Sequence, residues 1–163
     1  MAIRAVIRRA TRADVPVVLE LIRALAEYEK LAHLVQADEA LLREQLFSDT
    51  TPAETLLCIV DGAAVGFAVY FHNFSTFMGR KGLYLEDLFV RPEQRGRGYG
   101  KALLLHVARL AHERGCGRFE WMVLDWNTPS IRFYEGFGAQ CMKDWRLFRV
   151  TGDALAALAR QSA

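Results

Sequence analysis

Apolar and polar positions along the chain form blocks that predict strands and helices in turn. Alternating positions, or short apolar runs bounded by turn residues, predict strands at residues 2–8, 54–60, 63–74, 82–90, 118–126 and 141–150. Apolar positions at helical spacing predict helices at residues 11–30, 36–47, 101–115, 128–138 and 153–161. Hairpins join the early strands and helices join the late ones. The pattern therefore predicts one α/β (α+β) domain over residues 1–163, with a mixed, mostly antiparallel sheet flanked by helices.

Particular residues predict the boundaries of several of these elements. Asp61-Gly62 is a strong hairpin signal between two strands. Asp38 is expected to cap the second helix, and Pro16 falls in the first turn of the first helix. Gly115 is expected to end the helix at 101–115.

Two adjacent carboxylates lie at the centre of the strand predicted at 82–90. With a period of two, Glu86 shares a face with Tyr84 and Leu88, while Asp87 lies on the opposite face. A buried carboxylate without a partner is costly, so such a pair needs an explanation. An edge strand or an ion pair would explain it, and so would a functional site.

The next eleven residues, RPEQRGRGYGK, contain the clearest ligand-binding pattern. Arginines alternate with glycines directly before the helix at 101–115. Glycine permits a close backbone approach, and a helix N-terminus offers N–H groups and a positive dipole. The loop therefore predicts a site for a multiply charged phosphate, formed with Arg91, Arg95 and Arg97; the alternative is a solvated turn.

Two common phosphate-binding motifs do not fit this loop. The Rossmann pattern fails because Leu103 stands where its third glycine belongs. The P-loop pattern fails because Ala102 follows Lys101. The remaining pattern is Arg-x-x-Gly-x-Gly, which begins at Arg95.

Composition excludes several other classes. The 163 residues are 52% hydrophobic and 25% charged, with a net charge of +2, so neither nucleic acid nor a membrane surface is indicated as a partner. Three cysteines without paired spacing and four dispersed histidines predict no disulfide framework and no metal. Without a signal-like or membrane-spanning apolar run, we expect a cytoplasmic protein.

Several stretches together resemble the GNAT superfamily of N-acetyltransferases, whose cofactor loop carries the pattern (Arg or Gln)-x-x-Gly-x-(Gly or Ala). They are IRRATRAD, YLEDLFV, VRPEQRGRGYGKALL and WNTPSIRFYEGFGA. Within the superfamily, RALAEYE, LYLEDLFV, DWNTPSIRFY and DWRLF are similar to the diamine (spermidine/spermine) and thialysine acetyltransferase group. The resemblance extends over nearly the whole chain.

The resemblance implies acetyl-CoA as co-substrate and assigns roles to residues. Tyr134 corresponds to the general acid that protonates the CoA thiolate, and Glu86 to the acid that contacts the amine and receives its proton. The implied cofactor contacts are Leu88, Phe89, Val90, Arg95, Gly96, Arg97, Gly98, Tyr99, Gly100, Lys101, Asn127 and Ser130. From the residues alone, a helix cap at Asn127 or Thr128 is a sufficient explanation, and a tyrosine such as Tyr134 on a short helix is more often a packed aromatic.

The resemblance also implies contacts with the acceptor amine. The candidates are Tyr28, Glu29, Glu86, Asp87, Glu120, Trp121 and Met122. For Asp87, a structural ion pair is as plausible as a substrate contact. The chain departs from the diamine enzymes at Lys30 and His33, where those enzymes carry further acids, and at Phe137, where they carry a basic residue. A single-amine substrate such as thialysine or lysine is therefore as plausible as a polyamine.

These observations predict an N-acetyltransferase that acts on a small primary amine by direct attack in a ternary complex. The resemblance also implies a homodimer with the last strand at its interface. Three alternatives remain open: acetylation of a protein lysine or N-terminus, a CoA-binding module without catalysis, and a nucleic-acid binder that uses the loop arginines.

Overall fold

A computed structural model describes residues 5–161 of the chain. The chain divides into two compact units, one ending at Leu124 and the other beginning at Asp125, and each is described by itself. The first unit contains the whole sheet and the three helices packed against it.

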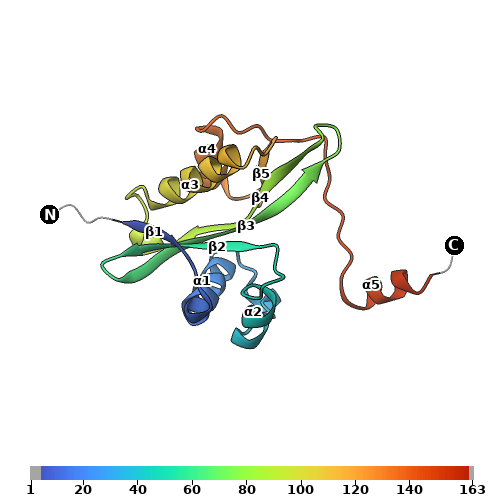
Figure 1. Ribbon diagram of the computed structural model, residues 1–163, viewed down its shortest axis with the longest axis horizontal. Coiled ribbons are helices and arrows are strands. Elements are labelled where there is room, and N and C mark those ends of the chain that lie inside the picture. Colours follow the sequence, from blue (N-terminus) through green and yellow to red (C-terminus); the bar gives the residue numbers. More distant parts are fainter. Residues whose placement is uncertain (1–4, 162–163) are drawn as a thin grey trace. The chain divides into compact units, whose positions relative to one another are not determined.

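The first unit is built on a five-stranded sheet (Figure 1). Its strands are β1 (Val6–Arg9), β2 (Glu54–Val60), β3 (Ala63–Ser75), β4 (Arg80–Val90) and β5 (Phe119–Trp121). They lie in sequence order; β1 to β4 pair antiparallel, and β5 pairs parallel with β4. This arrangement confirms the predicted mixed, mostly antiparallel sheet.

The hairpin between β2 and β3 turns where the sequence predicts it. Asp61 has φ 49° and Gly62 has φ 81°, and the flanking residues Val60 and Ala63 pair directly. Two consecutive left-handed residues match the twist of the strands, which explains the preference for Asp-Gly.

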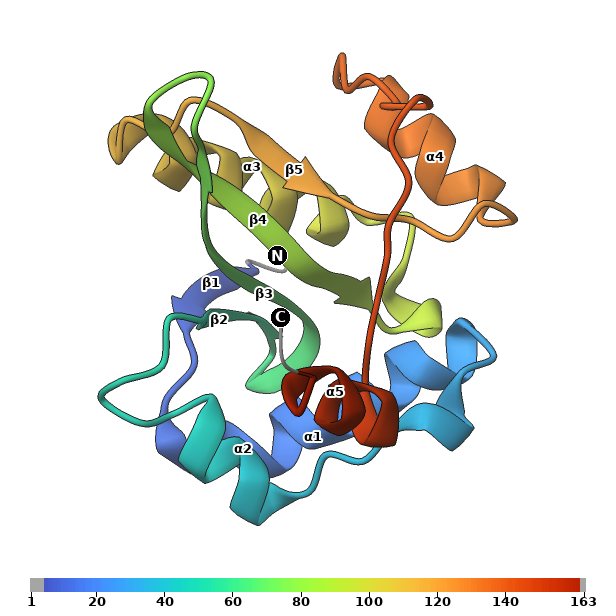
Figure 2. The same cartoon turned by 90° about the vertical axis from the view of Figure 1, so that its right-hand side faces the viewer.

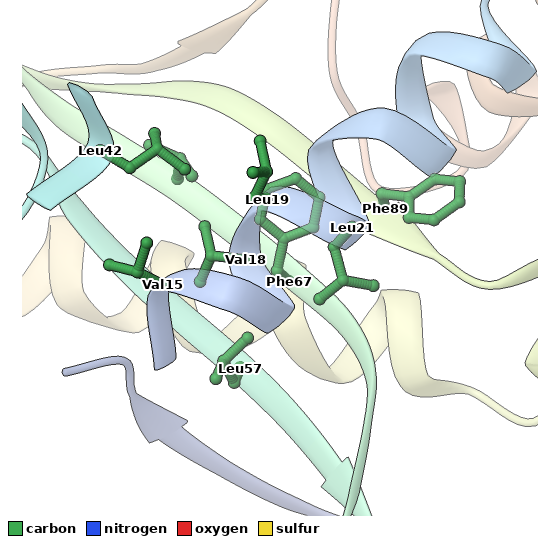
Figure 3. Close-up of a cluster of buried hydrophobic side chains, with 9 residues drawn as sticks. Val15, Val18, Leu19, Leu21, Leu42, Leu57, Phe67 and Phe89 are labelled. Atoms are coloured by element: carbon green, nitrogen blue, oxygen red, sulfur yellow. The ribbon is translucent and has the colours of Figure 1, made fainter. Parts of the chain in front are cut away.

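One face of the sheet is covered by α1 (Val15–Tyr28) and α2 (Glu39–Gln45). Asp38 caps α2 as predicted, since its carboxylate accepts the Leu41 N–H at 2.8 Å. Figure 3 shows the core beneath α1, which contains Val15, Val18, Leu19, Leu21, Leu42, Leu57, Phe67, Val69 and Phe89. Phe89 thus connects the end of β4 directly to the core.

The other face of the sheet is covered by α3 (Tyr99–Glu113). Its inward residues, among them Leu103, Leu104 and Val107, are almost fully buried. Gly115, with φ 68°, ends the helix region as predicted. The preceding residue, Arg114, donates two hydrogen bonds to the carboxylate of Glu54 in β2 and so links the end of α3 to the sheet.

The second unit contains α4 (Thr128–Glu135) and α5 (Gly152–Ala159), both near their predicted positions. The strand predicted at 141–150 is wrong: this segment has no strand structure, because no strand within the described chain pairs with it. The strand predicted at 118–126 is shortened to β5, since its pairing with β4 ends at Trp121. Of the strand predicted at 2–8, residues 2–4 lie outside the described part.

Gly66 of β3 lies opposite Val90, at the end of β4. A Cβ atom at Gly66 would come within 2.6 Å of the Phe89 carbonyl oxygen and 3.0 Å of the Val90 side chain. A glycine is therefore required at this close approach between strands, and the position of the β4 end depends on it.

Replacing Gly66 with alanine should push the end of β4 away from β3. We expect Gly66→Ala to lower the free energy of unfolding by about 1–3 kcal/mol, measured by urea denaturation. Gly100→Ala is the matched control, because its Cβ would have ordinary contact at 3.7 Å and alanine favours a helix. Equal stability of the two variants would contradict this account of Gly66.

Candidate active site

A β-bulge interrupts β4 at the two adjacent carboxylates. Asp87 pairs with Val69 and Leu85 pairs with Tyr70, so Glu86 is an extra residue without a partner on β3. A bulge of this kind shifts the alternation of side chains by one position.

The bulge corrects the predicted faces of β4. Residues directly opposite on antiparallel strands lie on the same face, so Asp87 shares the α1 face with Val69. Tyr84 lies opposite Phe71, two residues beyond Val69, and is therefore on the α1 face as well. The prediction that Tyr84 and Asp87 lie on opposite faces is wrong, because strict period-two counting cannot pass through a bulge.

Three carboxylates gather where β4 passes the end of α1. Asp87 is half-buried, and burial, followed by the charges of Glu86 and Glu29, raises its pKa to about 7. Burial also raises the pKa of Glu29, the C-cap residue directly after α1. Within the described residues no ion pair or hydrogen bond compensates Asp87, so the ion-pair interpretation of this residue has no support. The cluster has the electrostatic character of a site for a cation.

The edge of β4 is open beyond the bulge. Pairing with β5 extends from Leu83 to Leu85, whereas β4 continues to Val90. Figure 2 shows β4 running on past the arrowhead of β5. In the first unit, the stretch from Glu86 to Val90 therefore has no strand partner on that side, and its edge is available to an extended ligand.

A left-handed turn leads from this edge into α3. Gly96 and Gly98 have φ of 75° and 84°, and Gly98 is the N-cap residue of α3. The first helical N–H groups, beginning at Tyr99, have no carbonyl of a preceding turn to bind. This geometry is that of an anion site at a helix N-terminus, as the loop sequence predicts.

The three loop arginines have different surroundings. Arg91 forms an ion pair with Glu20 at 2.7 Å and donates to the Ala64 carbonyl at 3.2 Å. The guanidinium of Arg95 lies over the Tyr28 ring. Arg97 is exposed and, among the described residues, has no hydrogen bond or ion pair. A phosphate site shared by all three arginines stays a prediction.

The candidate residues on and after β5 have different environments. The Glu120 carboxylate forms an ion pair with Arg118 at 2.7 Å and accepts from Asn73 at 3.0 Å. Trp121 is half-buried and contacts the Phe119 ring, and Met122 is exposed. The ion pair gives Glu120 a structural function that the sequence did not indicate.

The remaining candidates belong to the second unit. Asn127 is buried and caps α4, since its side-chain oxygen accepts the Ser130 N–H at 3.4 Å. The helix-cap interpretation is therefore confirmed. Tyr134 is half-buried on α4, with its ring 5.3 Å from that of Phe133. The catalytic role of Tyr134 stays a prediction.

Tyr84 is a candidate that the sequence analysis missed. The bulge places it on the α1 face together with Asp87, and its ring lies 5.2 Å from that of Phe71. The bulge depends on the register between β3 and β4, so no local sequence pattern could have indicated this change of face.

A cleft of about 590 Å³ lies at a different place in the first unit. It is lined by residues of α1, of the β2–β3 turn and of the segment after β4, and of the predicted site residues it includes only Arg91. Its main charged groups already form the ion pairs Arg8–Asp14 and Arg91–Glu20. It is therefore not the candidate active site.

Neither a metal nor a membrane site is seen in the described part of the chain. Within residues 5–161, no three His, Cys, Asp or Glu side chains are placed to share a metal ion. No helix in the same range has the length and apolar character needed to cross a membrane.

Comparisons with known proteins agree with this geometry. Residues 17–139 match the Acetyltransferase (GNAT) family. The thialysine N-epsilon-acetyltransferase of Bos taurus is 38% identical, over 94% of this chain and 96% of its own. The L-ornithine N5-acetyltransferase NATA1 of Arabidopsis thaliana is 36% identical, over 93% and 86%. Among solved structures, an integron cassette protein from the mobile metagenome of V. cholerae has a TM-score of 0.82 at 26% identity, covering 96% of this chain and 98% of that chain.

The raised pKa of Asp87 has a consequence for stability. In the unfolded chain this carboxyl ionises near its ordinary value of 3.8, and in the folded chain near 7. The folded state therefore loses stability as the pH rises from about 4 to 7, and the loss is complete above that range.

Asp87→Asn should remove this penalty because the amide does not ionise. We expect the variant to be roughly 2–4 kcal/mol more stable than the parent at pH 8, with the difference vanishing near pH 4, by urea denaturation. Asp49→Asn, at an exposed position, is the control and should show little difference at either pH. An equal loss of stability at both pH values for Asp87→Asn would contradict the prediction.

Proposed function

Because the chain belongs to the Acetyltransferase (GNAT) family and is an N-acetyltransferase, we propose that it transfers the acetyl group of acetyl-CoA to a primary amine of a small molecule. The acceptors that we propose are thialysine, ornithine, lysine or a polyamine. We also propose that the protein acts in the cytoplasm.

The observation that carries the proposal is the arrangement along β4. Two adjacent carboxylates lie at the bulge, the strand edge then lies open, and the loop into α3 follows directly. An amine site, a binding edge for an extended arm and an anion site thus adjoin in the order that an amine and an acyl-CoA require.

In the proposed complex, cofactor contacts come mainly from the backbone. Leu88 to Val90 pair with the pantetheine arm, and N–H groups of Gly96 to Lys101 bind the pyrophosphate. The proposal is supported by the open edge of β4 and the left-handed loop glycines. Asn127 and Ser130 complete the contacts from α4, where Asn127 also serves as the cap.

The carboxylate cluster suits the first chemical requirement of the reaction. A primary amine arrives as a cation near neutral pH, and only its neutral form attacks a thioester. Glu29, Glu86 and Asp87 attract the cation. Glu86 then accepts a proton from the amine, directly or through water.

The remaining steps transfer the acetyl group without a covalent enzyme intermediate. The amine nitrogen attacks the thioester carbonyl carbon, and the Leu88 N–H stabilises the oxyanion. The carbon–sulfur bond breaks as the intermediate collapses. Tyr134 donates its phenolic proton to the departing thiolate, and the nitrogen of the new amide loses its excess proton, which returns to the phenolate through water.

The region around Tyr28 favours a short acceptor over a long polycation. Lys30 is the residue directly after Glu29, and His33 lies in the next short helix, η2 (Ala32–Leu34). An added cation weakens attraction of a second ammonium group. The names of the two relatives, which refer to thialysine and ornithine, agree with a single amino-acid-sized acceptor.

A homodimer forms part of the proposal. In the segment 141–150, large apolar side chains are exposed, including Trp145 at 76% and Phe148 at 89%. Exposed apolar groups of this size are typical of interaction surfaces, and most soluble oligomers consist of identical chains. We propose that a second copy of the chain covers these apolar side chains.

The function is tested by thiol release from acetyl-CoA with thialysine, ornithine, lysine, spermidine, putrescine and a lysine-containing peptide. We expect turnover of at least one free small amine well above the background without amine, and weaker turnover of the peptide. Turnover of the peptide alone would favour a protein acceptor. Binding of CoA without turnover of any acceptor would favour a CoA-binding module.

The assigned roles are tested with Glu86→Gln and Tyr134→Phe. We expect Glu86→Gln to lower kcat/KM for the best amine by about 10²–10⁴-fold, because the proton acceptor is lost. Tyr134→Phe should lower kcat by a similar factor with little change in either KM. Glu93→Gln, an exposed control in the short helix η3 (Pro92–Gln94), should behave like the parent. Full activity of either site variant would contradict its assignment.

A further inference from the structure

The side chain of Arg95 extends from the loop after β4 to the end of α1. Its guanidinium carbon lies 4.3 Å from the centroid of the Tyr28 ring and 5.5 Å from that of Phe89. Its Nε donates a hydrogen bond to the Val90 carbonyl at 3.0 Å. Three contacts therefore hold one side chain between the end of α1 and the end of β4.

Arg97, only two residues away, provides the contrast. Both arginines are exposed, but the described structure gives Arg97 no hydrogen bond or ion pair. The two arginines are separated by Gly96 in the left-handed conformation. A cation for the cofactor phosphates is thus available at Arg97, whereas Arg95 is already engaged.

The geometry at Arg95 depends on the shape of a guanidinium. Its planar group can stack on an aromatic ring while Nε donates to a carbonyl in the same plane. Lysine has the same charge but cannot reproduce this combination. Replacement by lysine therefore separates a requirement for charge from a requirement for shape.

We propose that Arg95 is a positioning residue for the amine acceptor: it holds the Tyr28 ring, and with it Glu29, against the end of β4, and it is not a ligand of the cofactor phosphates. This inference rests on the proposed function, in which Tyr28 and Glu29 contact the acceptor. It gives a specific role to the first residue of the Arg-x-x-Gly-x-Gly pattern in this chain.

Loss of this contact should affect the acceptor selectively. α1 ends at Tyr28, and the chain turns away at Lys30 with φ 62°. Without the stacked guanidinium, the last turn of α1 has lost its link to the cofactor loop. The acceptor then contacts a less ordered end of α1, while the N–H groups at the start of α3 remain in place.

The test compares Arg95→Lys, Arg95→Met and Arg97→Met in the full chain. For each variant, KM is measured for acetyl-CoA and for the best amine of the panel, and CoA affinity is measured by calorimetry. We expect both Arg95 variants to raise the amine KM about tenfold, with acetyl-CoA KM and CoA affinity within about twofold of the parent. Arg97→Met should show the opposite pattern.

A double-mutant cycle adds a readout that general destabilisation would not reproduce. Tyr28→Leu alone should raise the amine KM, and combination with Arg95→Met should add little further, because both changes remove the same contact. Additive effects of the two substitutions would overturn the proposal. Thermal unfolding of every variant identifies any loss of fold; if Arg95→Met does not fold, Arg95→Lys provides the comparison.

Other outcomes overturn the proposal as clearly. Weakened CoA binding in Arg95→Met that Arg95→Lys restores would make Arg95 a phosphate ligand. Unchanged KM values in both Arg95 variants would remove any role in acceptor binding. Absence of turnover by the parent protein with every amine would refute the proposed function itself, and CoA calorimetry would still decide whether Arg95 binds phosphate.

Discussion

The β-bulge in β4 is the constraint on which the site depends. One additional residue, Glu86, moves Asp87 to the face that α1 covers. The pairing of β4 with β5 stops at Leu85, directly before Glu86. A bulge increases local twist and bends its strand, so separation of β4 from its neighbour is its expected effect. The same irregularity thus produces both a carboxylate cluster and an open strand edge. A regular strand would have neither.

The carboxylate cluster is an electrostatic cost that the fold does not compensate internally. Burial and two like charges raise the pKa of Asp87 to about 7, and among the described residues no cation contacts it. A structural ion pair would have the opposite effect, as the carboxyl of Asp14 shows: its hydrogen bonds with Arg8 hold its pKa far below the ordinary value. Uncompensated charge is expected where a ligand supplies the counter-charge. The contrast between Asp87 and Asp14 within one chain therefore favours a cationic ligand at β4.

Local sequence signals predicted most of the fold, and non-local pairing accounts for what they missed. The turn at Asp61-Gly62, the cap at Asp38 and the loop glycines each depend on the conformation of a few neighbouring residues, so their sequence is sufficient. The bulge depends on the register between β3 and β4, which no local pattern contains. The same reason explains the absence of a strand at 141–150: alternating residues form a strand only where another strand pairs with them, and within the described chain none does.

Side-chain partners were the other limit of the sequence. Three arginines in one loop suggested a shared phosphate site, but each has a different environment. Distant residues of the chain set it for Arg91, whose partner Glu20 is 71 positions away, and for Arg95, whereas Arg97 faces solvent. Arg91 binds Glu20 of α1, and Arg95 stacks on Tyr28 near the end of the same helix. α1 thus draws two arginines away from the anion site that their own loop forms. In the proposed function, Arg97 is then the loop arginine that can bind a polyanion without breaking a contact that the described structure already contains.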